Sequence, residues 1–100
     1  MAELGAIVQK VRSKNAGPFW LTVDVFCGSA EVFARVVSAL DTARVAALYG
    51  VSGADIRRFD IADLSVVKFS FPRPTVQGTA ADRDMHGAAW AVLLEEMEIA

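Results

Sequence analysis

Apolar and polar residues alternate in two segments of the chain, and this alternation predicts two β-strands. In residues 19–26 every second position from Leu21 onward is apolar, with Thr22 and Asp24 between. Residues 64–71 repeat the pattern with Val67, Phe69 and Phe71 on one face. Such half-buried alternation in segments rich in β-branched and aromatic residues is typical of strands with one face on a core.

Between these strands the apolar residues recur every three or four positions, which predicts two helices over residues 30–40 and 41–49. Ser29 and Asp41 precede them and are suited to accept the unpaired backbone N–H groups of the first turn. Gly50 follows the second helix, where a left-handed residue commonly ends a helix.

Weaker patterns complete the expected order of elements. Residues 3–10 and 85–91 read as short helices and residues 93–99 as a last strand, although Glu95 and Glu96 would also suit a helix. Residues 55–60 are ambiguous, and a strand there would complete the order. A short N-terminal helix followed by β-α-β-β-α-β predicts an α+β, ferredoxin-like single domain over residues 1–100. Its two main helices would cover one face of a four-stranded antiparallel sheet and leave the other face bare.

Composition adds an expectation about that bare face. Hydrophobic residues make up 54% of the chain and its mean hydropathy is +0.38, a high value for a small domain. We therefore expect the surplus apolar residues to pack against a partner or a second copy. The longest apolar run, residues 87–94, is too short to span a membrane. A lone Cys27 and an N-terminus without signal-peptide features predict a cytoplasmic protein.

The charge balance argues against nucleic acid as a partner. Ten basic and twelve acidic residues give a net charge of −2, whereas phosphate contacts dominate nucleic-acid affinity. One local pattern keeps a DNA-binding alternative open. Residues 43–59 fit a helix-turn-helix, with Gly50 at the turn and Arg57 and Arg58 on the recognition helix. The competing interpretation is a capped helix that runs into a strand.

The densest polar cluster lies in residues 12–18, predicted to be a loop between the first helix and the first strand. Two cations, a hydroxyl, an amide and a glycine in one loop can wrap a carboxylate or phosphate. The competing interpretation is a solvated turn. The candidate anion-binding residues are Arg12, Ser13, Lys14, Asn15 and Gly17.

Other candidates for chemistry are weaker. Asp82, Asp84 and His86 stand two residues apart and could ligate a metal, although the favoured interpretation is that Asp84 caps a helix with His86 in its first turn. Asp24 either faces solvent or pairs with a cation of the 12–18 cluster. Cys27 is expected to be a small buried residue. Nothing in the sequence matches a known cofactor motif, zinc spacing or catalytic triad, so we expect no cofactor and no metal.

The stretch RSKNAGPFWLTVDVF at residues 12–26 resembles the signature of an uncharacterised family of small stand-alone domains carrying an RSKNAGP motif. That family is similar to the ferredoxin-like C-terminal domain of AtuA-type acyclic terpene utilisation proteins. LYGV at 48–51, PRP at 72–74 and LLEEMEI at 93–99 extend the resemblance. The chain departs from it after Gly87, where Ala88-Ala89-Trp90 replaces a polar Gln-Gln-His run.

This resemblance implies a ferredoxin-like fold and a small accessory or interaction subunit working beside a larger AtuA-like protein in bacterial catabolism. The 12–18 cluster would then bind the anionic group of a substrate. An alternative is a stand-alone lyase or hydratase acting on a carboxylate, with Lys14 or His86 as acid or base. The helix-turn-helix module is a second alternative. We favour a non-catalytic or co-catalytic subunit, because the residues offer no self-sufficient catalytic set.

Overall fold

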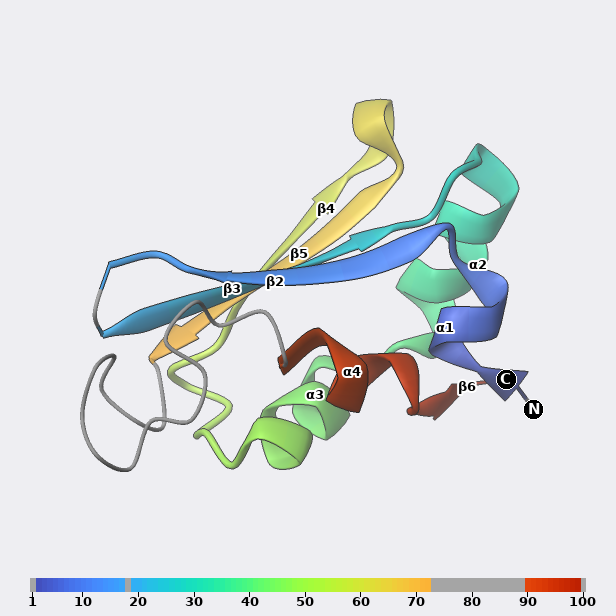
Figure 1. Cartoon of the computed structure of the whole chain (residues 1–100). Coiled ribbons are helices and arrows are strands. Elements are labelled where there is room, and N and C mark those ends of the chain that lie inside the picture. The colour runs from blue at the N-terminus through green and yellow to red at the C-terminus, as the bar shows by residue number, and fades with distance from the viewer. Residues whose placement is uncertain (1, 18, 73–89, 100) are drawn as a thin grey trace.

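The centre of the molecule is a four-stranded antiparallel sheet, shown in Figure 1. The computed structural model describes residues 2–17, 19–72 and 90–99. The strands are β2 (Lys10–Asn15), β3 (Trp20–Phe26), β4 (Arg57–Ile61) and β5 (Val66–Pro72), in the spatial order β2-β3-β5-β4. The predicted α+β, ferredoxin-like class with a four-stranded antiparallel sheet is confirmed.

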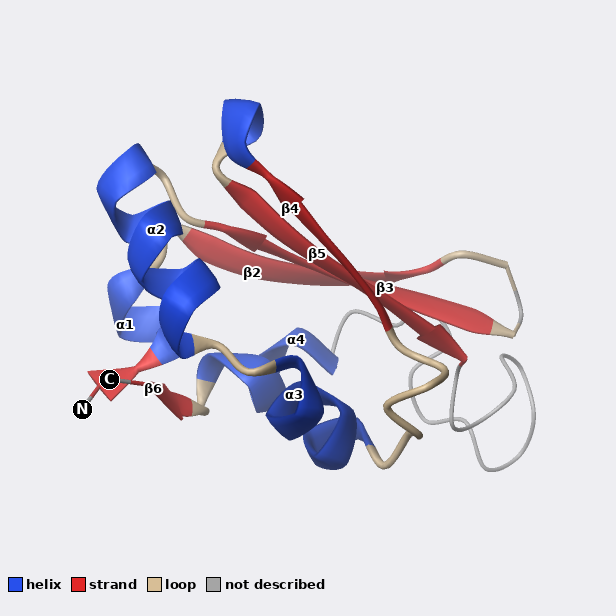
Figure 2. Cartoon of the chain, turned by 180° about the vertical axis from the view of Figure 1, so that it is seen from behind, coloured by secondary structure: helices blue, strands red, loops and turns tan. Residues whose placement is uncertain are grey.

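The helices lie on one face of this sheet. Figure 2 shows the molecule from behind. They are α1 (Leu4–Ile7), α2 (Ala30–Ala39), α3 (Thr42–Tyr49) and α4 (Trp90–Glu95), and a 3-10 turn, η1 (Ala62–Leu64), joins β4 to β5. No element in the described part of the chain covers the opposite face of the sheet. In the same residues, no helix is long and apolar enough to cross a membrane.

The identity of the fourth strand differs from the expectation. Residues 12–18 were predicted as a loop, but Lys10–Asn15 form the edge strand β2, paired along its whole length with β3. The closing residues Glu98–Ile99 form β6, which pairs with β1 (Ala2–Glu3) in a separate two-stranded ladder beside the chain ends (Figure 1). The polar character of β2 concealed its alternation, because just one apolar side chain, Val11, marks its inner face.

The helix ends follow the predicted local chemistry. The Ser29 hydroxyl accepts the Val32 N–H at 3.2 Å, and an Asp41 carboxylate oxygen accepts the Ala43 N–H at 3.0 Å. Gly50 ends α3 in the left-handed conformation with φ +69°. These bonds satisfy backbone groups that a helix end otherwise leaves unpaired.

The core lies between the sheet and the helices. The inward side chains of β3 and β5 are fully buried and belong to one core cluster with residues of α1, α2, α3 and α4. They are Leu21, Val23, Val25, Val67, Phe69 and Phe71. Tyr49 of α3 stacks on Phe71 with ring centroids 4.7 Å apart, which fixes α3 against the sheet.

Two predicted elements are corrected by the structure. The helix-turn-helix is wrong because residues 50–56 are not helical and Arg57 begins strand β4, so no recognition helix follows α3. The predicted strand over residues 93–99 is shorter, since α4 continues to Glu95 before β6 begins. The rest of the helix predicted at 85–91, up to residue 89, lies outside the described residues.

Candidate functional site

The side chains on the sheet face away from the helices form the candidate site, here called the open face. Directly opposed residues on antiparallel strands share a face, so the strand register defines its members. They are Lys10, Arg12 and Lys14 on β2; Trp20, Thr22, Asp24 and Phe26 on β3; Val66, Lys68 and Ser70 on β5; and Arg57, Phe59 and Ile61 on β4.

Positive charge gathers on the open face. It carries five of the ten lysines and arginines of the chain but one carboxylate, Asp24. Within the described residues, the Arg12, Lys14 and Lys68 side chains form no hydrogen bond or ion pair. An acidic protein therefore presents one strongly basic surface whose cations are available to an external anion.

Asp24 occupies the middle of this surface. It lies opposite Arg12 on one neighbouring strand and opposite Lys68 on the other. Its Oδ1 atom is buried and has no hydrogen-bond partner. Buried carboxylate oxygens normally accept a hydrogen bond, so this atom is an acceptor without a donor among the described residues.

Aromatic rings border the cations. Lys10 Nζ lies 4.8 Å from the centroid of the Phe26 ring, and the Arg57 guanidinium lies 5.6 Å from that of Trp20. Both distances allow cation–π attraction, which holds the two cations over rings at opposite ends of the face. Phe59 on the edge strand β4 remains 48% exposed. The face thus offers cations in its centre and apolar contact at its rim.

The predicted anion cluster is divided by the strand that contains it. Arg12 and Lys14 point to the open face, whereas Ser13 points to the helices and is 4% exposed. The Ser13 hydroxyl accepts the Ala91 N–H at 2.9 Å and so anchors the start of α4 to β2. Gly17 lies in the hairpin between β2 and β3. Its φ of +84° is in the left-handed region, which favours glycine.

The remaining predicted site residues fall in two groups. Asn15 ends β2 opposite Leu21, next to the hairpin and away from the centre of the open face. Asp82, Asp84 and His86 lie outside the described residues. In the described part of the chain, no three metal-ligating side chains come together.

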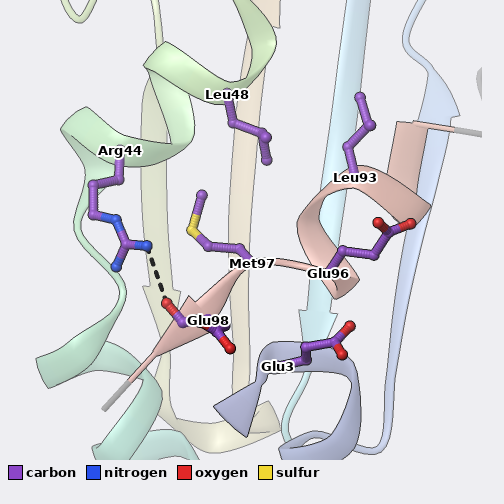
Figure 3. Close-up of a pocket in the computed structure, with 7 residues that line it drawn as sticks. All are labelled: Glu3, Arg44, Leu48, Leu93, Glu96, Met97 and Glu98. Atoms are coloured by element: carbon purple, nitrogen blue, oxygen red, sulfur yellow. Dashed lines mark hydrogen bonds between the residues drawn. The ribbon is translucent and has the colours of Figure 1, made fainter. Parts of the chain in front are cut away.

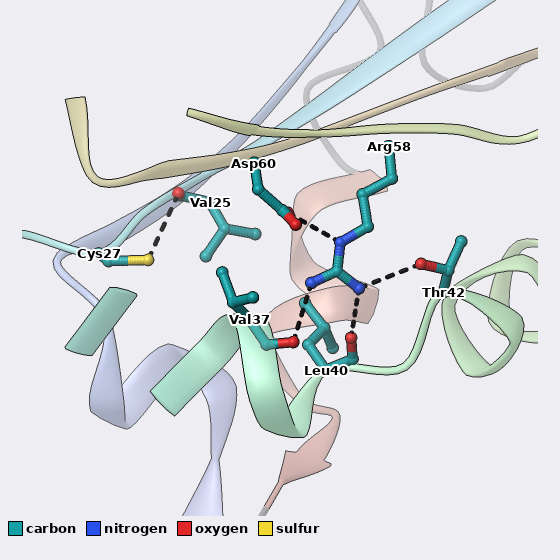
Figure 4. Close-up of polar contacts among 7 residues, drawn as sticks. All are labelled: Val25, Cys27, Val37, Leu40, Thr42, Arg58 and Asp60. Carbon is teal, nitrogen blue, oxygen red and sulfur yellow. Dashed lines mark hydrogen bonds and ion pairs between the residues drawn. The ribbon is translucent and has the colours of Figure 1, made fainter. Parts of the chain in front are cut away.

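Arg57 and Arg58 have opposite orientations. Arg57 belongs to the open face, while the Arg58 guanidinium lies among the helix ends on the other side (Figure 4). Its acceptors are Leu40 O at 2.6 Å, Asp60 Oδ1 at 2.9 Å, Thr42 Oγ1 at 3.0 Å and Val37 O at 3.2 Å. Arg58 therefore ties the end of α2 to β4.

Cys27 is also part of the core. It is buried as expected, and its thiol donates to the Val25 carbonyl oxygen at 3.8 Å (Figure 4). Burial raises the pKa of the Cys27 thiol, which disfavours the reactive thiolate. A nucleophilic role for this residue is not supported by its surroundings.

A second polar region, here called the acidic pocket, lies on the helix side of the sheet. It is an open pocket of about 640 Å³ between α3, α4 and the β1–β6 ladder (Figure 3). Its lining consists of Glu3, Arg44, Leu48, Leu93, Glu96, Met97 and Glu98. The Arg44 Nη2 atom donates to the Glu98 carbonyl oxygen at 3.0 Å and thereby links α3 to β6.

The sequence identified Arg12, Lys14 and Asp24 as candidates but gave no indication that Lys68 and Thr22 lie beside them. The missing signal was the strand order, because Lys68 is 44 positions from Asp24 along the chain and is opposite it in the sheet. The surplus of apolar residues is also placed differently from the expectation. Several large exposed apolar side chains, among them Leu64, Val92 and Leu93, lie off the open face, which is basic.

Comparison with known proteins gives one result. No curated protein and no solved structure matches the chain. A family model described as Domain of unknown function (DUF4387) matches residues 4–98, so the chain belongs to that family.

Proposed function

We propose that this protein is an accessory, interaction subunit whose open face binds an anionic group, a carboxylate or a phosphate, at its junction with a larger protein. The observation that carries the proposal is the set of five cations on a sheet face that no described element covers. Cations without internal partners contribute little to stability, and a basic surface on an acidic protein favours recognition of an anion.

The same charges oppose a symmetric dimer through the open face. A two-fold contact would place five cations of one copy against five of the other, and like charges across an interface are unfavourable. An acidic or anion-carrying partner is complementary instead. A homo-oligomer would have to use another surface, such as the exposed Val92 and Leu93 of α4.

The resemblance of residues 12–18 and 93–99 to AtuA-type proteins supports a larger AtuA-like protein in bacterial catabolism as this partner. We place both proteins in the cytoplasm, where a free Cys27 stays reduced. The stand-alone lyase or hydratase has less support, because Lys14 is exposed on the open face and His86 lies outside the described residues. No metal or cofactor is needed for the binding role.

Titration with inorganic phosphate, followed by amide chemical shifts in NMR spectra, tests the anion site. We expect shifts on β2, β3 and β5, and weaker binding in Arg12→Gln and Lys14→Gln. Arg44→Gln is the matched control, because it removes an exposed cation in the acidic pocket. Equal loss of affinity in all three variants would indicate a nonspecific charge effect and contradict the site.

Co-expression with an AtuA-type protein tests the partner. Charge reversal in Arg12→Glu/Lys14→Glu should abolish co-purification, while Arg44→Glu should leave it intact. Retained co-purification in the double variant would show that the open face is not the junction.

A further inference from the structure

We propose that the open face is the docking surface for an amphipathic helix of the partner protein, with acidic residues on one flank of that helix and apolar residues on the other. This inference rests on the proposed function, because it specifies the chemistry of the protein that covers the face. Its basis is the order of side chains across the sheet. Cations line one edge of the open face, and apolar residues gather toward the opposite edge.

The strand register arranges the open face in three rows that cross the sheet from β2 to β4. In order, the rows are Lys10, Phe26, Val66 and Ile61; Arg12, Asp24, Lys68 and Phe59; and Lys14, Thr22, Ser70 and Arg57. The β2 edge is therefore cationic in every row. The apolar side chains form one block, made of the first row beyond Lys10 together with Phe59.

Both sides of this arrangement are accessible. The three cations of β2 are exposed. On β4, Phe59 is 48% exposed and Ile61 is partly buried. A partner on this face therefore meets positive charge on one side and apolar surface on the other. The complementary partner surface is acidic beside apolar.

The backbone of the sheet selects a helix as the partner segment. Strands β3 and β5 each pair with two neighbours, so their N–H and C=O groups are used within the sheet. A segment on the face meets side chains and has to satisfy its own backbone groups, which a helix does and an extended peptide does not. Helices already cover the other face, and a sheet between two helical layers is a common architecture.

The size of the face suits one helix that lies along the strands. Strands β2 and β4 are three strand spacings apart, about 14 Å, and a helix with its side chains is about 10–12 Å wide. The cations of β2 recur about every 6.8 Å, close to the helical pitch of about 5.4 Å. Long basic side chains can absorb this difference, so each turn of the helix can place one carboxylate over β2.

Single-stranded nucleic acid is the alternative occupant of a basic sheet with aromatic side chains. The open face suits it less well. Lys10 lies over the Phe26 ring and Arg57 over the Trp20 ring, so both rings already hold a cation where a base would stack. Asp24 also interrupts the cations in the middle of the face, which opposes a continuous chain of phosphates.

Two synthetic peptides of identical composition test the inference on the full chain. Each has about fourteen residues of leucine, glutamate and alanine, and a hydrocarbon staple keeps it helical, because so short a helix is marginal in water. The matched peptide has its leucines and glutamates on adjacent flanks, whereas the shuffled peptide has them spread around the helix. We expect the matched peptide to bind at least about fivefold more tightly. It should shift the NMR signals of β2 and β4 together.

Substitutions at the two edges of the face separate the two flanks. Phe59→Thr removes an exposed ring and should weaken binding of the matched peptide about five- to tenfold. Phe19→Thr is the matched control and should have little effect, because Phe19 is 61% exposed but precedes β3 and lies outside the open face. Arg12→Gln should weaken binding of both peptides and of inorganic phosphate.

The outcomes distinguish this inference from the proposed function. Equal binding of the two peptides, together with phosphate binding that Arg12→Gln weakens, would overturn the helix and leave the anion site standing. Equal effects of Phe59→Thr and Phe19→Thr would also overturn it. Tighter binding of a single-stranded oligothymidylate than of the matched peptide would assign the face to nucleic acid instead. Failure of phosphate and of both peptides to bind would overturn both proposals.

Discussion

The open face and the acidic pocket both contain cations, but the cations have different surroundings. In the pocket, Arg44 donates to the Glu98 carbonyl oxygen, and in this way it joins α3 to β6. On the open face, Arg12, Lys14 and Lys68 form no ion pair or hydrogen bond within the described residues. A cation with an internal acceptor is explained by the fold, whereas a group of cations without one points to an external ligand.

The same contrast separates two adjacent residues. Arg58 has four acceptors among the helix ends and β4, while its neighbour Arg57 lies over the Trp20 ring on the open face. The alternation of a strand places them on opposite sides. Net charge conceals this division, because a value of −2 for the whole chain gives no sign of a basic face.

The largest expected effect on stability comes from replacing Arg58, whose guanidinium is bonded within the fold. Arg58→Gln removes charged hydrogen bonds to Leu40, Val37 and Asp60 and should lower the free energy of unfolding by about 3 kcal/mol. Urea denaturation measures it. The matched control Arg57→Gln should change stability by less than about 0.5 kcal/mol. Similar losses in both variants would remove the distinction between the two regions.

Ser13 gives the next largest effect. Its substitution by alanine leaves the Ala91 N–H without an acceptor at the start of α4, which should cost about 2 kcal/mol. Ser38→Ala on the exposed side of α2 is the control and should be close to neutral. Phosphate binding at the open face should be unchanged in folded Ser13→Ala. A loss of anion affinity without a loss of stability would mean that Ser13 takes part in anion binding and contradict its structural role.

Unfolding at alkaline pH tests the hydrogen bond that joins α3 to α4. The Tyr49 hydroxyl donates to the Trp90 carbonyl oxygen at 2.8 Å. Burial, and then the negative charge of Glu95, raises the pKa of Tyr49 well above its usual value. The neutral phenol is therefore favoured in the folded state, so its stabilising effect is complete below about pH 10, the unfolded pKa, and declines above it.

We expect the free energy of unfolding to fall by up to about 1.4 kcal/mol for each pH unit above 10. Because burial also raises the pKa of Cys27, the measurement is made in a Cys27→Ala background. Adding Tyr49→Phe should flatten the pH dependence and lower stability at neutral pH by about 1 kcal/mol. An unchanged slope in that variant would mean that Tyr49 is not the titrating group.

Much of the fold followed from local patterns. The strands at residues 19–26 and 64–71 have enough β-branched and aromatic residues to be recognised, and the caps at Ser29 and Asp41 mark helix starts through their own chemistry. Strand β2 was missed because its inner face consists of Val11 and the small polar Ser13. Its pairing with β3, rather than its own composition, makes it a strand.

The candidate site was predictable in part. Arg12 and Lys14 were predictable as cations of a polar cluster. The sequence could not show that Ser13 faces the other side of the sheet, because the side chains of a loop do not alternate between two faces. Lys68 joins them through the pairing of β3 with β5, which is a long-range property of the sheet. Local sequence therefore identified cations, whereas strand order determined which of them act together.

The smallest expected effect concerns the cost of the basic face itself. Lys68→Gln removes the repulsion from the other cations of the open face, of which Arg12 shares its row, together with the attraction of Asp24, which lies directly opposite Lys68. Charge interactions at an exposed surface are worth about 0.5 kcal/mol or less, and these two have opposite signs, so the variant should be about as stable as the parent at low salt. Raising the salt to 0.5 M should change little, because the screening length is then only about 4 Å.

Thermal unfolding of Lys68→Gln at both salt concentrations measures this difference, and Arg44→Gln provides the opposite case. Arg44 donates to Glu98 O and lies beside three glutamates, so its loss should lower the melting temperature most at low salt. A loss in Arg44→Gln with little change in Lys68→Gln would mean that the fold gains from the cation of the acidic pocket and does not depend on that of the open face. Destabilisation by Lys68→Gln would make the basic face part of the folding energetics, and the argument for an external anion would then lose its main support.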